Sequence, residues 1–240
     1  MTIRLVSWNI EHCQAAWQKL ADDDSIDVAL VQEAVRPGVS RELAVFPATP
    51  DWTTAGGNRP FTTAIARLSD RVTVEQLPTK AIGDAAGGTL GVSQPGTLCV
   101  AQVAAGGAPL TVASAYCAWD EDVTAREIFA DSTAHRILSD ISPLLTAKHR
   151  LVLAGDWNIL FGYGEDGSDP WKRRYQTVFD RARELGLVFV GPQSPNGIQA
   201  EPWPEELPRE SKNVPTYRRR RSDPATGTRQ LDFVFVSAAL

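Results

Sequence analysis

The amino-acid sequence predicts a β-rich domain of the α/β or α+β class, in which two sheets pack face to face with helices outside. Short apolar runs of strand length recur along the whole chain, amphipathic helical patterns lie between them, and no internal repeat or linker divides the sequence. Hydrophobic residues make up 43% of the 240 residues, which is enough for a packed core. We therefore predict a single domain over residues 1–240.

The predicted strands are apolar runs bounded by glycine, proline or polar turns. The first run lies within Met1–Asn9, and the second, Asp27–Glu33, ends in a carboxylate. Further strands are expected at 61–68, 71–77, 97–103, 110–116, 150–155 and 230–237. Gly-rich turns between the middle runs predict antiparallel pairs. Two stretches rich in proline and glycine or in polar residues, 36–60 and 191–215, are expected to be loops.

Helices are predicted where apolar residues recur at every third or fourth position. The first is expected over Glu11–Leu20. A long amphipathic helix is expected to begin at a Thr124–Glu127 capping box and to carry apolar residues as far as Leu145. A later helix, with Tyr175 on its apolar face, is expected to end at Gly186 in a left-handed conformation.

Composition and charge limit the partners and the compartment. The net charge of −5 argues against a broad surface for polyanions, although a narrow cationic patch beside an acidic metal site remains compatible with it. Cys13, Cys99 and Cys117 give neither a disulfide framework nor zinc spacing, so we expect buried free thiols. The sequence shows no signal pattern and no apolar run near the ~18 residues of a membrane span. We therefore expect a reduced, cytoplasmic protein with no membrane association and no obligate protein partner.

Polar residues end or interrupt the predicted strands at several separate places. They are Asn9, Glu33, Asp156, Asn158 and Asp232. One carboxylate at a strand end is more often solvated than functional, and one asparagine there usually caps a turn. Five such residues on four strands are harder to explain in this way, because buried polar groups need partners. If the strands lie side by side, these side chains meet at one end of the sheets.

Metal-assisted hydrolysis of a phosphate ester requires this set of residue types. Mg²⁺ takes oxygen ligands and keeps several waters, so one or two carboxylates and an amide oxygen suffice to hold it. The cation neutralises the phosphate, and a second carboxylate can orient or deprotonate the attacking water. We therefore predict Mg²⁺ or Mn²⁺ as the cofactor.

Five motifs resemble those of the endonuclease/exonuclease/phosphatase superfamily of metal-dependent phosphodiesterases. They are SWNIE around Asn9, LVQEA around Glu33, ASAY around Tyr116, GDWN around Asp156 and QLDFVFVS around Asp232. They follow the order of the superfamily from residue 2 to the end, with a variable stretch at about 36–92. The resemblance implies a four-layer α/β sandwich of two mostly antiparallel sheets flanked by helices, with the active site where the sheet ends meet.

The resemblance also implies a role for each matched residue. Glu33 would be the chief metal ligand, with Asn9 beside it. Asp156 would position or activate the attacking water, and Asn158 would hold the scissile phosphate and help to place Asp156. Tyr116 stands where the superfamily has His or Tyr, and a Tyr is more similar to the abasic-site endonuclease and exonuclease III branch.

The sequence departs from the superfamily at its C-terminal end. The superfamily ends with one more strand and a Ser-Asp-His motif, whose histidine is oriented by the residue that matches Asp232. This chain ends at Leu240, and its histidines, His12, His135 and His149, lie in other contexts. Two explanations remain open: a truncated chain that lacks the last strand, or a natural variant without the motif. We favour truncation, because the abrupt end would leave a sheet edge uncovered. For His12, local packing explains its position better than metal binding does.

Basic and aromatic residues near these motifs are candidates for substrate contact. Arg218, Arg219 and Arg220 belong to a run of four arginines before the last strand, which is either a solvated loop or a phosphate contact. The basic stretch 172–174 is a weaker candidate of the same kind. Trp157, within GDWN, is the aromatic candidate.

These observations favour metal-dependent hydrolysis of phosphodiester bonds in DNA or RNA. One alternative is a phosphatase or phosphodiesterase that acts on a small-molecule or lipid phosphate, which the acidic net charge favours slightly. Another alternative is an inactive or binding-only variant that lacks the Ser-Asp-His motif.

Overall fold

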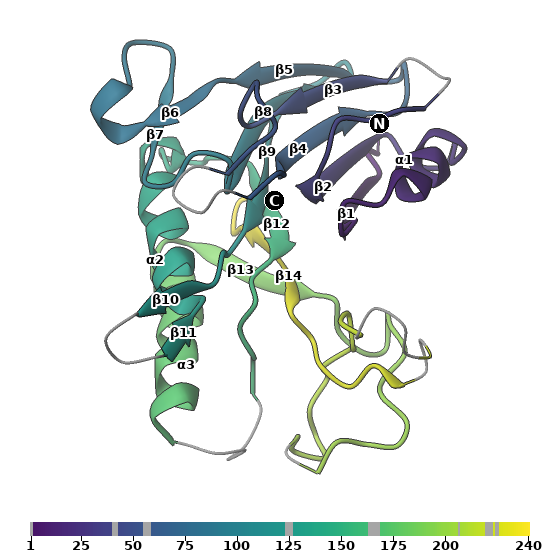
Figure 1. The fold of residues 1–240 in the computed structure, drawn as a ribbon, viewed down its shortest axis with the longest axis vertical. Helices are drawn as coiled ribbons and strands as arrows, with labels where there is room; N and C mark the ends of the chain where they lie inside the picture. The colour runs from purple at the N-terminus through teal and green to yellow at the C-terminus, as the bar shows by residue number, and fades with distance from the viewer. Residues whose placement is uncertain are drawn as a thin grey trace.

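Two β-sheets face each other at the centre of the molecule, and helices cover their outer faces (Figure 1). The computed structural model describes residues 2–39, 43–54, 59–122, 127–162, 169–205, 207–218, 223 and 226–240, and only the backbone at 120–122, 127–129 and 169–171. The predicted four-layer α/β sandwich is confirmed. Each main sheet is mixed, because each contains one parallel strand pair among antiparallel ones.

The smaller main sheet has four strands in the order β1-β2-β4-β3. Its strands are β1 (Leu5–Asn9), β2 (Val28–Ala34), β3 (Ala44–Pro47) and β4 (Thr62–Arg67). β1 and β2 run parallel, and the other pairs are antiparallel. Strand β3 lies within the stretch that was expected to be a loop, so that expectation was wrong. It is short, lies at the edge of the sheet and ends in Pro47, which an edge strand tolerates because it needs no further ladder hydrogen bond there.

The larger sheet has six strands in the order β13-β14-β12-β9-β8-β5. They are β5 (Thr73–Leu77), β8 (Leu98–Ala104), β9 (Leu110–Tyr116), β12 (Leu151–Asp156), β13 (Leu187–Gly191) and β14 (Asp232–Ser237). The expected antiparallel pairing of the middle runs is confirmed for β5–β8 and β8–β9. β12 pairs in parallel with β9 and antiparallel with β14, so it joins chain segments that lie far apart in sequence.

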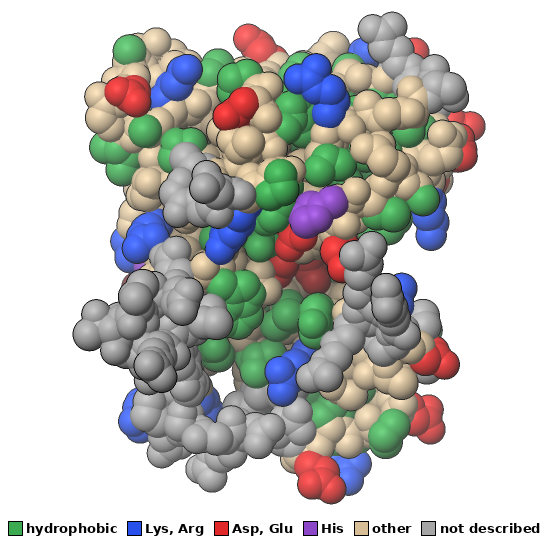
Figure 2. Space-filling view, viewed as in Figure 1, with side chains coloured by type: hydrophobic (Ala, Val, Ile, Leu, Met, Phe, Trp, Pro, Cys, Tyr) green, Lys and Arg blue, Asp and Glu red, His purple; other side chains and the backbone are tan. Residues whose placement is uncertain are grey.

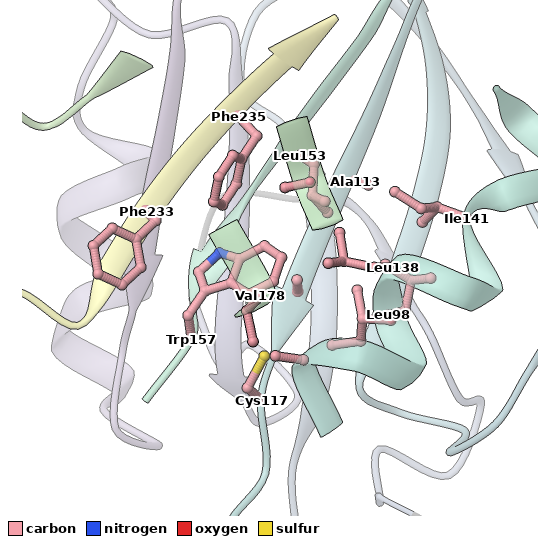
Figure 3. Packing of buried hydrophobic residues seen from close by; sticks show 14 of the residues in the cluster. Leu98, Ala113, Cys117, Leu138, Ile141, Leu153, Trp157, Val178, Phe233 and Phe235 are labelled. Atoms are coloured by element: carbon pink, nitrogen blue, oxygen red, sulfur yellow. The ribbon is translucent and has the colours of Figure 1, made fainter. Parts of the chain in front are cut away.

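Three helices form the outer layers. Helix α1 (Gln14–Ala21) buries Trp17 against the four-stranded sheet, and the Trp17 indole donates to the Val35 carbonyl at 3.0 Å. Helices α2 (Asp131–Asp140) and α3 (Asp169–Glu184) lie side by side on the six-stranded sheet (Figure 1). Figure 3 shows Leu138 of α2 packed among β-strand side chains such as Leu98 and Leu153 in this outer core. Gly186 follows α3 with a φ of +75°, as its sequence position predicts.

The predicted long helix before β12 is shorter than expected. Residues Glu127–Phe129 form strand β11, which pairs with β10 (Asp120–Asp122), and Thr124 lies outside the described residues. Helix α2 therefore begins only at Asp131. It ends before the 3₁₀ turn η2 (Ser142–Leu144), because the proline in that turn has no N–H to continue the α-helical hydrogen bonds.

Smaller elements complete the described fold. Strands β6 (Thr79–Ala81) and β7 (Leu90–Val92) form a parallel pair around the 3₁₀ turn η1 (Ile82–Asp84). The described part of 191–215 is a loop beyond the last residue of β13, as expected. All three cysteines are free; Cys99 and Cys117 are buried as expected, whereas Cys13 is exposed. Among the described residues, no helix has the length and apolar character that crossing a membrane requires.

Strand alternation explains why polar side chains gather at one end of the space between the sheets. Val28, Leu30, Val112 and Ala154 belong to the apolar core between the sheets. Side chains on one face of a strand recur at every second residue, so each strand carries a row of side chains that face the other sheet. These rows, here called stripes, continue from the apolar core towards one end of the sheets. The stripe residues are Leu5, Ser7 and Asn9 in β1; Val28, Leu30 and Gln32 in β2; Val112, Ser114 and Tyr116 in β9; Val152, Ala154 and Asp156 in β12; Val234 and Asp232 in β14.

Candidate active site

The polar residues predicted from the strand ends meet where the two sheets come together. The Asn9 side-chain nitrogen donates to Glu33 Oε1 at 3.1 Å and to Asp156 Oδ2 at 2.8 Å. Asn9 and Asp156 are 147 residues apart in sequence and lie in different sheets. Figure 2 shows acidic side chains gathered in a hollow at the waist of the molecule, with a histidine on its rim.

Glu33 reaches this hollow because β2 is irregular at that residue. In a regular strand, Glu33 would lie on the same face as Val31, which packs in the outer core with α1. The pairing of β2 with β4 shifts register between Val31 and Ala34, and Glu33 has a φ of +47°. This left-handed residue turns the carboxylate away from the helix layer and towards Asn9.

Asp156 is buried and held by the residue two positions later. The Asn158 backbone N–H donates to Asp156 Oδ1, and the Asn158 side-chain nitrogen donates to Asp156 Oδ2, both at 3.1 Å. The same nitrogen lies 3.1 Å from the carbonyl oxygen of Cys117, and Asn158 has a φ of +51°. Burial raises the pKa of Asp156 well above its ordinary value of 3.8, and the negative charge of Asp232 raises it further.

Asp232 lies beside Asp156 on the neighbouring strand, where the two residues are paired in register. Burial raises the pKa of Asp232 from 3.8 to about 6, against a smaller lowering by the Thr216 hydroxyl. Thr216 Oγ1 also accepts the backbone N–H groups of Leu231 and Asp232 at 3.0 Å, so it fixes the start of β14. A buried carboxylate, Asp156, and a half-buried one, Asp232, thus share one end of the β12–β14 pair.

Tyr116 faces the same carboxylates from the end of β9. Its ring packs edge-on against Phe61, with ring centroids 5.4 Å apart. Burial raises the pKa of Tyr116, and the charges of Glu33 and Asp156 raise it further. The phenol therefore stays protonated at neutral pH, so it can donate a hydrogen bond.

The rim of the hollow contains residues that the sequence did not identify as site residues. His12 Nε2 lies 3.2 Å from Glu33 Oε2, and the imidazole stacks on Phe61 with a centroid distance of 4.7 Å. Arg59 lies 6.0 Å from the Tyr116 ring centroid and donates to the Trp119 carbonyl at 2.7 Å. Local packing was the expected explanation for His12, but its side chain is 42% exposed and touches Glu33. The position of His12, three residues after Asn9, was the sequence feature that could have pointed to the site. Arg59 and Phe61 lie in the variable stretch at about 36–92, where no motif pointed to them.

Trp157 does not lie in the hollow, so its predicted contact with substrate is wrong. Its side chain is 0% exposed and packs against Phe235, with ring centroids 5.0 Å apart. Figure 3 shows the indole inside the core between the six-stranded sheet and its helices. Strand alternation explains this, because Trp157 follows Asp156 and points to the opposite face.

The predicted basic contacts lie partly outside the described residues. Arg218 is exposed, whereas Arg219 and Arg220 are not described. Within the stretch 172–174, Arg174 forms a two-pronged ion pair with Asp131 at 2.8 and 3.0 Å, which joins α3 to α2. Arg174 therefore has a structural role, and phosphate binding by that residue is not supported.

The donor set at the hollow fits a hard divalent cation. Glu33, Asp156 and Asp232 supply carboxylate oxygens, and Asn9 supplies an amide that already bridges two of them. Among the described residues, no three His, Cys, Asp or Glu side chains are close enough to form a complete metal site by themselves. A hard cation such as Mg²⁺ takes few protein oxygens and keeps several waters. The Asn9 side-chain oxygen accepts a hydrogen bond from the Glu11 backbone N–H at 2.9 Å. For this oxygen to bind the cation directly, the Asn9 amide group would have to rotate so that its oxygen faces the hollow.

The two facing sheets, with their outer helices and a polar cluster at one shared end, form the fold of the endonuclease/exonuclease/phosphatase proteins. No model of a known family matches the sequence, and no curated protein matches it. Solved structures match over almost the whole chain. The endonuclease domain of TRAS1, a telomere-specific non-LTR retrotransposon, has a TM-score of 0.62 and 20% identity, over 99% of this chain and 86% of that one.

Two further solved structures have the same fold. The AP endonuclease LMAP from Leishmania major has a TM-score of 0.58 and 13% identity, over 98% of this chain and 78% of that one. The 3′ phosphatase NExo from Neisseria, bound to a product DNA hairpin, has a TM-score of 0.56 and 17% identity, over 99% and 88% of the two chains. At these identities the similarity establishes the fold.

Proposed function

We propose that this protein hydrolyses phosphodiester bonds in nucleic acid with the help of Mg²⁺ or Mn²⁺. The observation that carries the proposal is the contact of Asn9 with both Glu33 and Asp156, which joins the two sheets at one acidic hollow. The similar solved structures are an endonuclease domain, an AP endonuclease and a 3′ phosphatase bound to DNA, which supports a nucleic-acid substrate.

Glu33 would hold the cation, with Asn9 beside it, because its carboxylate lies at the edge of the hollow and is partly accessible to solvent. When bound, the cation would neutralise charge on the scissile phosphate and stabilise the charge that develops on its oxygens. Removal of the Glu33 carboxylate should therefore abolish the metal dependence together with the activity.

Asp156 is the proposed base. Burial raises its pKa in the metal-free protein, a cation nearby would keep it charged and able to accept a proton, and Asn158 fixes the direction of its oxygens. Asp156 would orient a water for attack on phosphorus and take up its proton. Asn158 would move with Asp156 as one unit, because two hydrogen bonds join the two residues.

Tyr116 is the proposed donor to a phosphate oxygen, because its raised pKa keeps the phenol protonated. His12 and Arg59 would provide N–H donors for the substrate on the Phe61 side of the hollow. Exposed aromatic surface near these donors, at Trp119, suits the face of a base. A substrate with bases as well as phosphates uses all of these groups, whereas an isolated small phosphate does not.

A cleavage assay tests this proposal. Labelled single-stranded and duplex oligonucleotides are incubated with MgCl₂, with MnCl₂ or with EDTA, beside a panel of mononucleotides, inositol phosphates and sphingomyelin. The wild type should cleave oligonucleotides only with metal. A Glu33→Ala/Asp156→Ala double variant should lose at least about 10³-fold in rate. Asp70→Ala, which removes a carboxylate that is 99% exposed, is the matched control and should keep full activity.

Three outcomes would overturn parts of the proposal. Equal cleavage by the wild type and the double variant would remove the active-site assignment. Turnover of a small or lipid phosphate without oligonucleotide cleavage would replace nucleic acid as the substrate. Metal binding without turnover of any substrate would identify a binding-only protein.

A further inference from the structure

A layer of polar side chains lies directly beneath the acidic hollow, between the two sheets. Ser7 and Ser114 each lie two residues before a hollow residue, Asn9 and Tyr116, on the same face of their strands. Gln32 immediately precedes Glu33. Below this layer the inter-sheet core is apolar, beginning with residues such as Leu30.

One side chain, Gln32, joins these strands. Its side-chain nitrogen lies 2.9 Å from Ser114 Oγ in β9 and 3.3 Å from Ser7 Oγ in β1. Ser114 Oγ donates its own proton to the carbonyl of Val31 at 3.0 Å, so its lone pairs face the Gln32 amide. Residues 31 and 32 of β2 are thereby fixed to the opposite sheet at the point where the β2 irregularity begins.

This arrangement is a poor way to stabilise a core. Gln32 and Ser114 are both 0% exposed, and the Gln32 side-chain oxygen has no hydrogen-bond partner among the described residues. An unpaired buried oxygen costs free energy, and an apolar side chain of similar size would fill the same space without that cost. Stability alone therefore does not account for an amide at this position.

We propose that Gln32 is a positioning residue, which holds the irregular turn of β2 so that the Glu33 carboxylate faces Asn9 and the cation. This inference rests on the proposed function, since Glu33 is the residue whose direction matters. Without the Gln32–Ser114 tie, Glu33 would be released from its left-handed conformation towards the regular strand geometry, in which its carboxylate faces the α1 layer.

The test compares buried polar residues at opposite ends of the sheets. Gln32→Leu and Ser114→Ala break the tie beneath the hollow. Ser237→Ala is the matched control, because the Ser237 hydroxyl is also buried and joins β14 to β12, accepting from the Leu151 N–H at 2.6 Å. That contact lies at the end of the β12–β14 pair opposite Asp156 and Asp232. Each variant is measured by urea unfolding, by Mn²⁺ titration without substrate, and by kcat and KM on an oligonucleotide.

Ser114→Ala and Ser237→Ala should lose stability, whereas Gln32→Leu should keep or gain stability, because it removes the unpaired buried oxygen. Only the two variants beneath the hollow, Gln32→Leu and Ser114→Ala, should lose Mn²⁺ affinity and kcat. Mutation of a residue that orients a metal ligand without touching the metal typically lowers metal affinity or rate by about 10–100-fold. Losses of about 10-fold or more are therefore expected for Gln32→Leu. KM should change by less than about threefold, because the substrate-contacting residues remain. The Gln32→Leu/Ser114→Ala double variant should lose no more than the worse single variant, since both break one tie.

Two results would overturn the inference. The first is Mn²⁺ affinity and kcat in Gln32→Leu and Ser114→Ala that match those of Ser237→Ala. The second is a wild type that binds no Mn²⁺. A wild type that binds Mn²⁺ without cleaving any oligonucleotide would reject the proposed function only, and the Mn²⁺ titrations would still decide the role of Gln32. If Gln32→Leu does not fold, Ser114→Ala carries the comparison alone.

Discussion

Asp156 takes its chemical character from the residues around it. It is buried beside another carboxylate, Asp232, and both pKa values are raised. Hydrogen bonds from Asn9 and Asn158 partly offset this and hold the carboxylate in one orientation. The same residue at an exposed strand end would be an ordinary solvated carboxylate. A cation in the hollow would favour the charged forms, so the metal-free protein is expected to be strained electrostatically at neutral pH.

Asp232→Asn should stabilise the metal-free protein at pH 7.5. The folded pKa of Asp232, about 6, lies above the ordinary 3.8, so the folded state binds more protons between these values. The wild type therefore has the full stability that a protonated Asp232 allows below about pH 4. It loses this stability as pH rises through about 6 and the side chain becomes charged. In EDTA at pH 7.5, the variant should gain about 1–3 kcal/mol in free energy of unfolding, measured with urea.

The control for this prediction is pH itself. Other carboxylates titrate in both proteins, so the difference between variant and wild type is the quantity to follow. It should shrink as pH falls from 7.5 to 4.5. A difference that stays constant over this range would show that Asp232 is not the group responsible.

Tyr116→Phe should lower kcat by about 10²-fold, which is the usual cost of losing one donor to a developing negative charge. The ring would keep its edge-on packing against Phe61, so the unfolding free energy should change little. Steady-state kinetics and urea unfolding measured together separate the two effects. An unchanged kcat would exclude the phenol from the chemistry.

The sequence predicted that polar residues at the strand ends would meet, but it did not point to the residues on the rim of the hollow. Asn9, Glu33, Asp156, Asn158 and Asp232 were visible because a polar residue stands out against an apolar run. His12 lies in a turn and Arg59 in an isolated bridge with Thr54, so no periodicity marks them, and only the three-dimensional contacts place them at the hollow. Trp157 was wrong for the opposite reason, since its place in GDWN suggested the site while strand alternation sends it into the core.

Individual strands were easier to predict than their pairing and their irregularities. β2 and β12 were expected within one or two residues of their observed bounds, because their apolar runs are continuous. The register shift at Glu33 depends on long-range hydrogen bonds through Gln32, which no local pattern encodes. For the same reason, Ile128 was assigned to a helix, although its segment pairs with β10.

Gly155→Ala tests how closely β12 and β9 approach each other. A Cβ at Gly155 would collide with the Ala115 backbone carbonyl in the paired strand, and backbone atoms cannot move aside as a flexible side chain can. We expect a loss of about 3 kcal/mol or more in unfolding free energy, or failure to fold. Gly87→Ala is the control, because a Cβ there meets nothing within 4 Å, and it should be close to neutral. Equal stability of the two variants would contradict the close approach.

At the scale of the whole molecule, two sheets bring distant segments to one place. The hollow combines residues from near both ends of the chain with β9 and β12 from its middle, and each sheet contributes one side (Figures 1 and 2). The net charge of −5 means that nucleic acid would be held by a few local donors rather than by a basic surface.

Salt should therefore weaken oligonucleotide cleavage only moderately. Two or three phosphate contacts to a single strand predict a rise in KM of about 10-fold between 50 and 200 mM KCl. A small diester such as bis(p-nitrophenyl) phosphate should show less than about a threefold change. A rise above 10³-fold would require many more phosphate contacts than the described residues offer.

The central claim is that carboxylates from both sheets hold one divalent cation at the hollow. Anomalous diffraction from crystals soaked in MnCl₂ tests this claim most directly. The account predicts one strong manganese peak against the Glu33 carboxylate, on the side of Asn9 and Asp156, and its loss in crystals of Glu33→Ala. A manganese peak elsewhere, with none at the hollow under saturating MnCl₂, would contradict it.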